Sequence, residues 1–190
     1  MRLYRCLPFS LYADFVDSVS EEWVIPKPEP VFWKTKKCGV YCLYPYAQAK
    51  PMIKQWKFNG DVALGYRLGQ VIGETFKDVL HDKTISYVPR YGEGYPYVGN
   101  HLFSLLGGIA DVSGCEVVPA YKKIRQTFPQ KALSRRARMM NLSGSFAAVG
   151  KADIVVDDVF TTGSTCSSIY DAAPFEAWLV VSRVDLILEH

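Results

Sequence analysis

Apolar residues along this chain follow two different spacings, and the two spacings alternate. Short runs rich in Val, Ile and Tyr, typical of strands, occur at 39–44, 84–89, 116–121, 145–149, 153–159 and 177–184. Between them, apolar residues three and four positions apart predict helices at 51–57, 62–80, 102–109 and from Ser164 onward. This order favours an α/β fold with a parallel sheet flanked by helices, whose ligand site lies at the carboxyl ends of the strands.

Residues 1–37 depart from this alternation. They are aromatic and rich in proline, and they predict a short helix at 10–19 followed by a proline-broken connector. We therefore expect this helix and connector to precede one domain over residues 38–187. The last three residues, 188–190, resemble the start of a cloning linker and His tag and carry no argument.

Composition narrows the class of protein. The chain has 190 residues, 49% hydrophobic and 22% charged, which suits one globular domain with a sizeable core. No apolar run approaches the ~20 residues that span a bilayer, and residues 1–10 lack the pattern of a signal peptide. The five cysteines are scattered and odd in number, which favours free thiols over a disulfide framework. We therefore expect a cytoplasmic protein without a membrane span.

The net charge of +3 hides an uneven distribution. Residues 117–152 hold eight of the 22 basic residues and no acid, so the rest of the chain has a balance of −5. A basic segment on a mildly acidic protein indicates a local anionic partner and argues against general coating of nucleic acid.

Two adjacent acids stand at the end of the predicted strand 153–159. Asp157 and Asp158 follow three apolar residues and come shortly before the loop 161–165. Carboxylates accept hydrogen bonds from hydroxyl groups, so the pair suits a ligand that carries a diol. The alternative is a strand that ends in an acidic turn and binds nothing.

The loop 161–165 predicts a phosphate site beside these acids. Gly163 lets the backbone approach an anion closely, and a helix follows, with Ser164 or Thr165 as its expected cap. The N-terminus of a helix presents N–H groups to an anion. A ribose 5-phosphate, which has a diol next to its phosphate, satisfies both predictions.

The segment 153–165 resembles the phosphoribosyl-diphosphate (PRPP) signature of type I phosphoribosyltransferases: apolar residues, two acids, a spacer and Thr-Thr-Gly-small-Thr. The resemblance implies a type I phosphoribosyltransferase-like sheet and a catalytic, ribose-binding role for Asp157 and Asp158. It also implies that the 5-phosphate is bound by Thr161, Thr162, Gly163, Ser164 and Thr165.

A second resemblance lies upstream of this signature. The basic segment Arg125-Gln126-Thr127-Phe128-Pro129-Gln130, followed by Leu133, Arg136 or Arg138, Asn141 and Gly144-Ser145-Phe146, is similar to a segment of the competence-protein ComF family. The stretch 53–61 and the strand end Val88-Pro89 also resemble that family, so the likeness covers about residues 40–185. The family's N-terminal zinc module, with its paired Cys-x-x-Cys, is absent.

The resemblance implies a pyrophosphate site formed by the loop after strand 84–89 and by a flexible basic hood. Arg90, Arg125, Gln130 and Arg136 are its expected contacts. Cations from a closing loop would neutralise the leaving pyrophosphate and exclude water, whereas the alternative for the hood is a solvated basic helix. The family's Arg-Gly-aromatic-Asn near the next helix is replaced by Val-Gly-Asn-His at 98–101. His101 is a candidate general acid, and the commoner role is a histidine that flanks a helix end.

Two functions follow from the resemblance. The first is an enzyme that binds PRPP with Mg²⁺, the metal being held through PRPP without direct protein ligands, and lets a nitrogen nucleophile displace pyrophosphate. The second is a non-catalytic module that senses PRPP or a nucleoside monophosphate, or an adaptor in DNA uptake with single-stranded DNA or competence proteins as partners. The acceptor, the binding of DNA and the oligomeric state, a homodimer included, stay open.

Overall fold

The computed structural model describes residues 23–92, 100–128 and 135–184, without the side chains of Arg135, Arg136, Arg138 and Met139. Six strands form the main sheet in the order β1-β2-β8-β7-β3-β4. Their bounds are β1 (Val31–Lys34), β2 (Gly39–Pro45), β8 (Ala177–Arg183), β7 (Ile154–Phe160), β3 (Thr84–Tyr87) and β4 (Glu116–Val117). All neighbours pair in parallel except β1, which pairs with β2 in antiparallel fashion.

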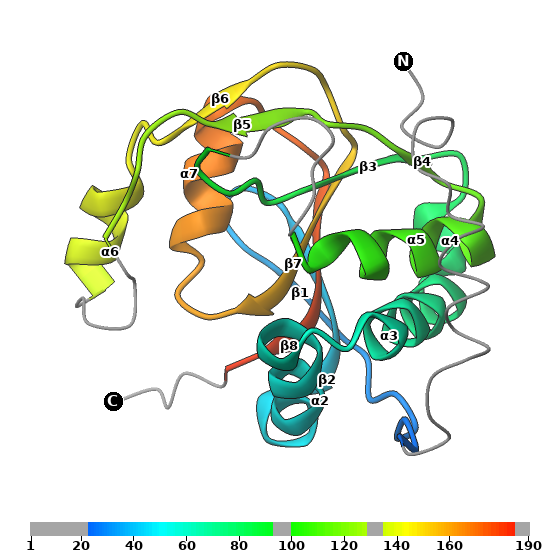
Figure 1. Cartoon of the computed structure of the whole chain (residues 1–190). Coiled ribbons are helices and arrows are strands. Elements are labelled where there is room, and N and C mark those ends of the chain that lie inside the picture. The colour runs from blue at the N-terminus through cyan, green and yellow to red at the C-terminus, as the bar shows by residue number, and fades with distance from the viewer. Residues whose placement is uncertain (1–22, 93–99, 129–134, 185–190) are drawn as a thin grey trace.

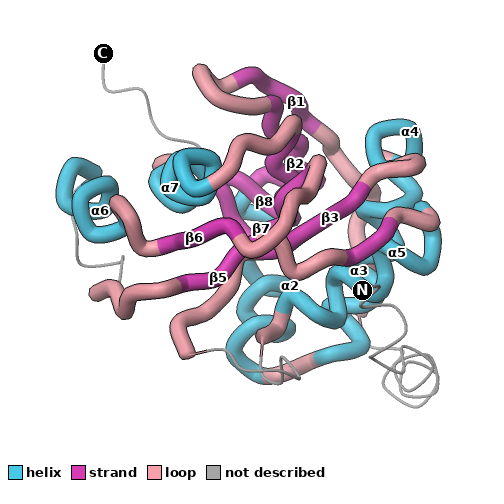
Figure 2. Tube along the Cα trace, turned by 90° about the horizontal axis from the view of Figure 1, so that it is seen from above, coloured by secondary structure: helices cyan, strands magenta, loops and turns pink. Residues whose placement is uncertain are grey.

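Helices cover both faces of this sheet, as Figures 1 and 2 show. One face carries α2 (Tyr46–Asn59), α3 (Val62–Thr75), α4 (Lys77–Leu80) and α5 (Leu102–Ser113), and the other carries α7 (Ser164–Ala172). The predicted fold class is therefore confirmed: the chain is a mixed α/β protein with a mostly parallel six-stranded sheet flanked by helices, compatible with a type I phosphoribosyltransferase-like fold.

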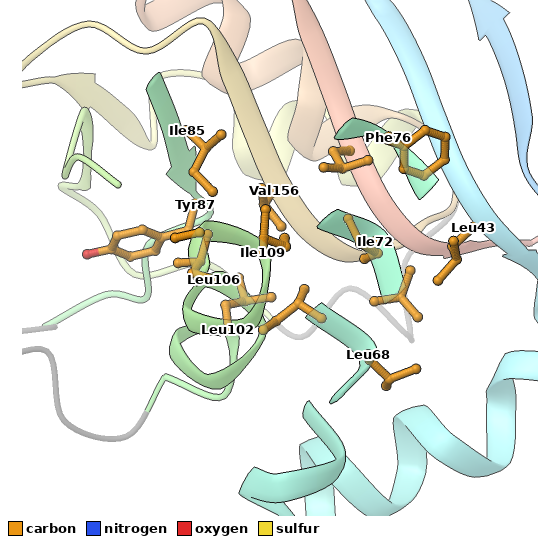
Figure 3. Close-up of a cluster of buried hydrophobic side chains, with 14 of the residues drawn as sticks. Leu43, Leu68, Ile72, Phe76, Ile85, Tyr87, Leu102, Leu106, Ile109 and Val156 are labelled. Carbon is orange, nitrogen blue, oxygen red and sulfur yellow. The ribbon is translucent and has the colours of Figure 1, made fainter. Parts of the chain in front are cut away.

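Side chains of β7 alternate between two apolar cores, because successive residues of a strand point to opposite faces. Ile154 and Val156 pack with α3 and α5 in the first core, whereas Val155 packs under α7 in the second. Figure 3 shows part of the first core, where Val156 lies among Leu106, Ile109 and Ile72. The same alternation determines on which face of the sheet each acid of β7 lies.

Three predicted elements differ from the observed ones, and a fourth cannot be compared. Residues 31–34, placed above in the connector, form β1, so the expected boundary at 37/38 separates two strands of one hairpin. The predicted helix 62–80 divides after Thr75, whose hydroxyl donates to the Val71 carbonyl at 2.7 Å, a contact that bends helices. The predicted strand 116–121 divides at Pro119, which has no N–H for a sheet ladder. The predicted helix at 10–19 lies outside the described residues.

The second part of that divided strand starts an arm beside α7. We define the arm as the described residues within 121–148: β5 (Tyr121–Lys123), α6 (Arg135–Leu142) and β6 (Phe146–Ala148). β5 and β6 form their own two-stranded antiparallel sheet, so the predicted strand 145–149 is not part of the main sheet. In Figures 1 and 2, α6 lies next to α7. Across the described ranges, no helix combines the length and apolar character needed to cross a bilayer.

Candidate functional site

The two acids of β7 lie on opposite faces of the sheet. β7 continues through both of them to Phe160, so the alternation that separates Val155 from Val156 also separates Asp157 from Asp158. Asp157 borders a hollow at the start of α7, whereas Asp158 contacts side chains of α2 and of the residue before α5. A ligand that contacts both carboxylates must therefore cross the carboxyl edge of the sheet.

Asp158 is the centre of a charged cluster. Its Oδ2 accepts hydrogen bonds from Lys57 Nζ and from His101 Nε2, the latter at 3.2 Å, and its Oδ1 accepts the Val159 N–H at 2.8 Å. Burial by itself would raise the pKa of Asp158, but His101 and the Lys57 ammonium outweigh it and hold the pKa well below its usual range. Asp158 is thus a fixed negative charge.

Asp157 has the opposite electrostatic character. It is half-buried, and its Oδ1 accepts the Asp158 N–H at 2.9 Å. Burial, and then the negative charge of Asp158, raise the pKa of Asp157 well above its usual range. A carboxyl group of this kind gains from a cation or from hydroxyl donors placed beside it.

We expect the substitution Asp157→Asn to stabilise the folded protein at pH 8. An acid whose folded-state pKa is raised destabilises the folded state above that pKa, and the penalty shrinks as pH falls. Asparagine keeps the Oδ1 acceptor and removes the charge. Thermal unfolding between pH 5 and 8 should therefore show the largest gain at pH 8.

Asp158→Asn is the matched control, because the folded-state pKa of Asp158 is depressed. Its charge stabilises the folded protein above the unfolded-state pKa and loses that effect as pH falls. We expect the control to lower the melting temperature at pH 8. A lower melting temperature for Asp157→Asn at pH 8 would contradict the prediction.

The loop after β7 opens α7 through a left-handed glycine. Gly163 has φ 75° and is the N-cap, so α7 begins at Ser164. The expected cap, Ser164 or Thr165, is thus wrong by one or two positions. The hydroxyls of Thr162 and Ser164 lie 2.8 Å apart and form a hydrogen bond with each other. The first N–H groups of a helix have no hydrogen-bond partner within the helix.

A hollow lies between this loop and the strand β8. Its walls include Asp157, Thr161, Gly163 to Cys166, and Trp178. The indole Nε1 of Trp178 is buried and has no hydrogen-bond partner among the described residues.

On the other face of the sheet, Lys57 and His101, the two side chains that bond Asp158, border a cavity of about 260 Å³. We call it the α5 cavity, and its walls are Trp56, Lys57, Gly60, Val62, Arg90, Asn100, His101, Phe103 and Ser104. Arg90 Nη2 lies 2.9 Å from His101 Nδ1. The His101 ring packs edge-on against Trp56 at 4.8 Å, and the Trp56 indole donates to the His101 carbonyl at 3.1 Å. His101 is therefore firmly positioned.

The structure brings some of the predicted site residues together and leaves others apart. Asp158, Arg90 and His101 form one cluster, and Asp157 borders the loop 161–165. Lys57 was not identified as a site residue from the sequence, although it lies within the stretch 53–61. The only available signal was that resemblance, since a lysine on a helix predicts no partner.

Arg125 stays away from this cluster and braces the arm. Its Nη2 donates to the carbonyls of Asn141 and Ser143, at 2.9 Å each. Asn141 in turn bonds the backbone of Phe128 through both of its side-chain atoms. Two of the residues that resemble the ComF segment thus hold the arm's own fold. Gln130 and the side chain of Arg136 lie outside the described residues, so their predicted contacts stay predictions.

No known family model matches the chain, and no curated protein matches it. Within the described parts of the chain, no three His, Cys, Asp or Glu side chains gather into a group that could hold a metal ion.

Proposed function

We propose that this protein binds PRPP across the carboxyl edge of the sheet and that a nitrogen nucleophile displaces pyrophosphate from it. The observation that carries the proposal is the hollow at the start of α7. A helix N-terminus behind the left-handed Gly163, the carboxyl of Asp157, and Thr161, Ser164 and Thr165 border this hollow. Phosphate oxygens and ribose hydroxyls match these groups.

The sugar ring and the pyrophosphate of PRPP would lie beside the cluster around Asp158 on the other face of the sheet. Asp158 is held ionised by Lys57 and His101, so it would stabilise the positive charge that develops on the sugar ring. Arg90 lines the α5 cavity and would contact the leaving pyrophosphate. Mg²⁺ binds substrate phosphates with few protein ligands, so it would be held through PRPP, while Asp157 and Asp158 would contact the ribose hydroxyls. When bound, the ion would neutralise charge on pyrophosphate.

Calorimetric titration tests this proposal. PRPP should bind with and without Mg²⁺, more tightly with it, and ribose 5-phosphate should bind as the smaller ligand. Pyrophosphate release should then be assayed with a panel of nitrogen bases and ammonia. A folded protein that binds neither PRPP nor ribose 5-phosphate would contradict the proposal.

One observation favours the second candidate, a module that senses PRPP or acts in DNA uptake. Arg125, an expected pyrophosphate contact, is engaged with the carbonyls at the end of α6 instead, which reduces the cations available for catalysis. The same titrations distinguish the two functions, because binding without pyrophosphate release supports the sensor. Single-stranded DNA binding that weakens with salt and with the double substitution Arg135→Ala and Arg136→Ala would support the adaptor.

A further inference from the structure

We propose that His101 is a proton acceptor for the nucleophile, covered by Arg90 and exposed when a pyrophosphate group draws Arg90 away. This inference rests on the proposed function and names a residue that works at the same site. Three observations carry it: the tautomer that Arg90 imposes on His101, the ionised partner behind the ring, and the cavity in front of it.

The contacts of His101 determine where its proton lies. A guanidinium group only donates hydrogen bonds, so Nδ1 must accept from Arg90 Nη2 across the 2.9 Å contact. The single proton of the neutral ring is therefore on Nε2, which donates to Asp158 Oδ2 at 3.2 Å. Nδ1 is the basic atom, and Arg90 covers it.

Charged groups from three elements face the ring. Lys57 comes from α2, Arg90 from the loop after β3 and Asp158 from β7. Burial lowers the pKa of His101, and the two cations add to this effect against the carboxylate. His101 is accordingly neutral near pH 7, the state that a base requires.

The arrangement resembles a carboxylate–histidine pair in which the carboxylate orients the ring and stabilises the imidazolium that forms. Lys57 keeps Asp158 ionised, so Asp158 is ready for that role before any ligand binds. The ring itself is fixed by Trp56, which packs against it and donates to its backbone carbonyl. Arg90 is exposed to solvent, and its side chain is the group that has to move.

The α5 cavity offers a place for both reactants. Arg90 and Lys57 provide cations for a phosphate group, while Trp56, Val62 and Phe103 provide apolar surface for a flat nitrogen ring. In the step that we propose, the N–H proton of the nucleophile passes to His101 Nδ1 as its nitrogen bonds to the anomeric carbon. The bond from that carbon to pyrophosphate breaks, and its electron pair leaves with pyrophosphate.

Nitrogen NMR of histidine in the full chain tests this inference. The chain has three histidines, His81, His101 and His190, and the variant His101→Gln assigns the relevant signals. We expect the Nε2–H tautomer for His101 and a pKa below the ordinary range of histidine. Adding inorganic pyrophosphate with Mg²⁺ should raise the pKa of His101, because Arg90 leaves Nδ1.

The variant Arg90→Met provides the decisive comparison. We expect it to raise the proton affinity of His101 about tenfold, which corresponds to one pKa unit, and to abolish the response to pyrophosphate. Arg67→Met removes a positive charge from α3 outside the cavity and is the matched control, for which we expect no change. An Nδ1–H tautomer, or an unchanged pKa of His101 in Arg90→Met, would overturn the inference.

A second readout separates this inference from the proposed function. If PRPP is turned over, His101→Gln should lower kcat and remove the acidic limb of its pH profile. A wild-type pH profile in His101→Gln would overturn the inference and leave the proposed function intact. Conversely, failure to bind PRPP would contradict the proposed function, while the tautomer and the Arg90→Met comparison would still decide whether Arg90 covers His101.

Discussion

Replacing Thr165 by glutamate is expected to weaken PRPP binding by about 100-fold or more, which corresponds to about 3 kcal/mol. Thr165 lies in the first turn of α7, which contains no acid, and it borders the hollow that we assign to the 5-phosphate. A carboxylate there would occupy the N–H groups at the helix N-terminus and repel the phosphate. The same carboxylate stabilises an isolated helix by about 0.3–1 kcal/mol, so binding should fall while thermal stability is kept or rises.

Thr165→Gln is the matched control, because glutamine has nearly the shape of glutamate without its charge. We expect it to weaken PRPP binding by less than about tenfold, a difference of about 1.4 kcal/mol at most. Calorimetry with PRPP and with ribose 5-phosphate measures both variants, and thermal unfolding confirms that both are folded. Equal affinities for Thr165→Glu and Thr165→Gln would mean that the phosphate does not bind at the start of α7.

Local patterns were sufficient to predict the elements that hold the loop 161–165. The apolar run before Asp157 predicts a buried strand, and β7 is one of the two central strands of the six-stranded sheet, with neighbours on both sides. The Thr, Gly and Ser residues after the acids predict a loop that opens a helix, and α7 begins at Ser164, directly after Gly163. These features depend on residues within one turn or one strand, so sequence spacing is enough to find them.

The division of the site between two faces needed the tertiary structure. β7 stays a strand through Phe160 because Val159 and Phe160 pair with Ser182 and Arg183 of β8. That pairing imposes the alternation that sends Asp157 and Asp158 to opposite faces. Nothing in the spacing of two adjacent acids before a loop indicates whether the strand ends before or after them.

The cluster around Asp158 was beyond prediction for a related reason. Lys57 and His101 are 101 and 57 residues away from Asp158 along the chain, and they meet it only because α2 and α5 cover the same face of the sheet. The same applies to Arg125, whose contacts with Asn141 and Ser143 form across the arm. Basic residues in a segment indicate an anionic ligand only where their side chains do not already form hydrogen bonds within the fold.

Replacing Gly69 by alanine is expected to lower the free energy of unfolding by about 3 kcal/mol, near the upper end of overpacking effects. Gly69 lies where α3 crosses α5, and a Cβ built there would come within 2.1 Å of the Leu105 carbonyl oxygen and 3.0 Å of the Ile109 nitrogen. Both are backbone atoms of α5, so no side-chain rotation relieves the clash and α5 must move. His101 directly precedes α5, so we expect the His101–Asp158 contact to weaken as well.

Gly73→Ala is the control, because it makes the same change one turn later in α3. There a Cβ would lie 3.0 Å from the Ile109 carbonyl oxygen and 3.1 Å from the Val112 Cβ, a tight fit that a small shift relieves. Alanine gains about 1 kcal/mol over glycine in a helix, which should offset much of that cost, so the two variants differ mainly in the depth of the backbone clash. Urea denaturation measures both stabilities, and the histidine NMR signals report on His101. Equal stability of the two variants would contradict the close approach of α3 and α5 at Gly69. The packing of α3 on α5 would then not be what holds His101 beside Asp158.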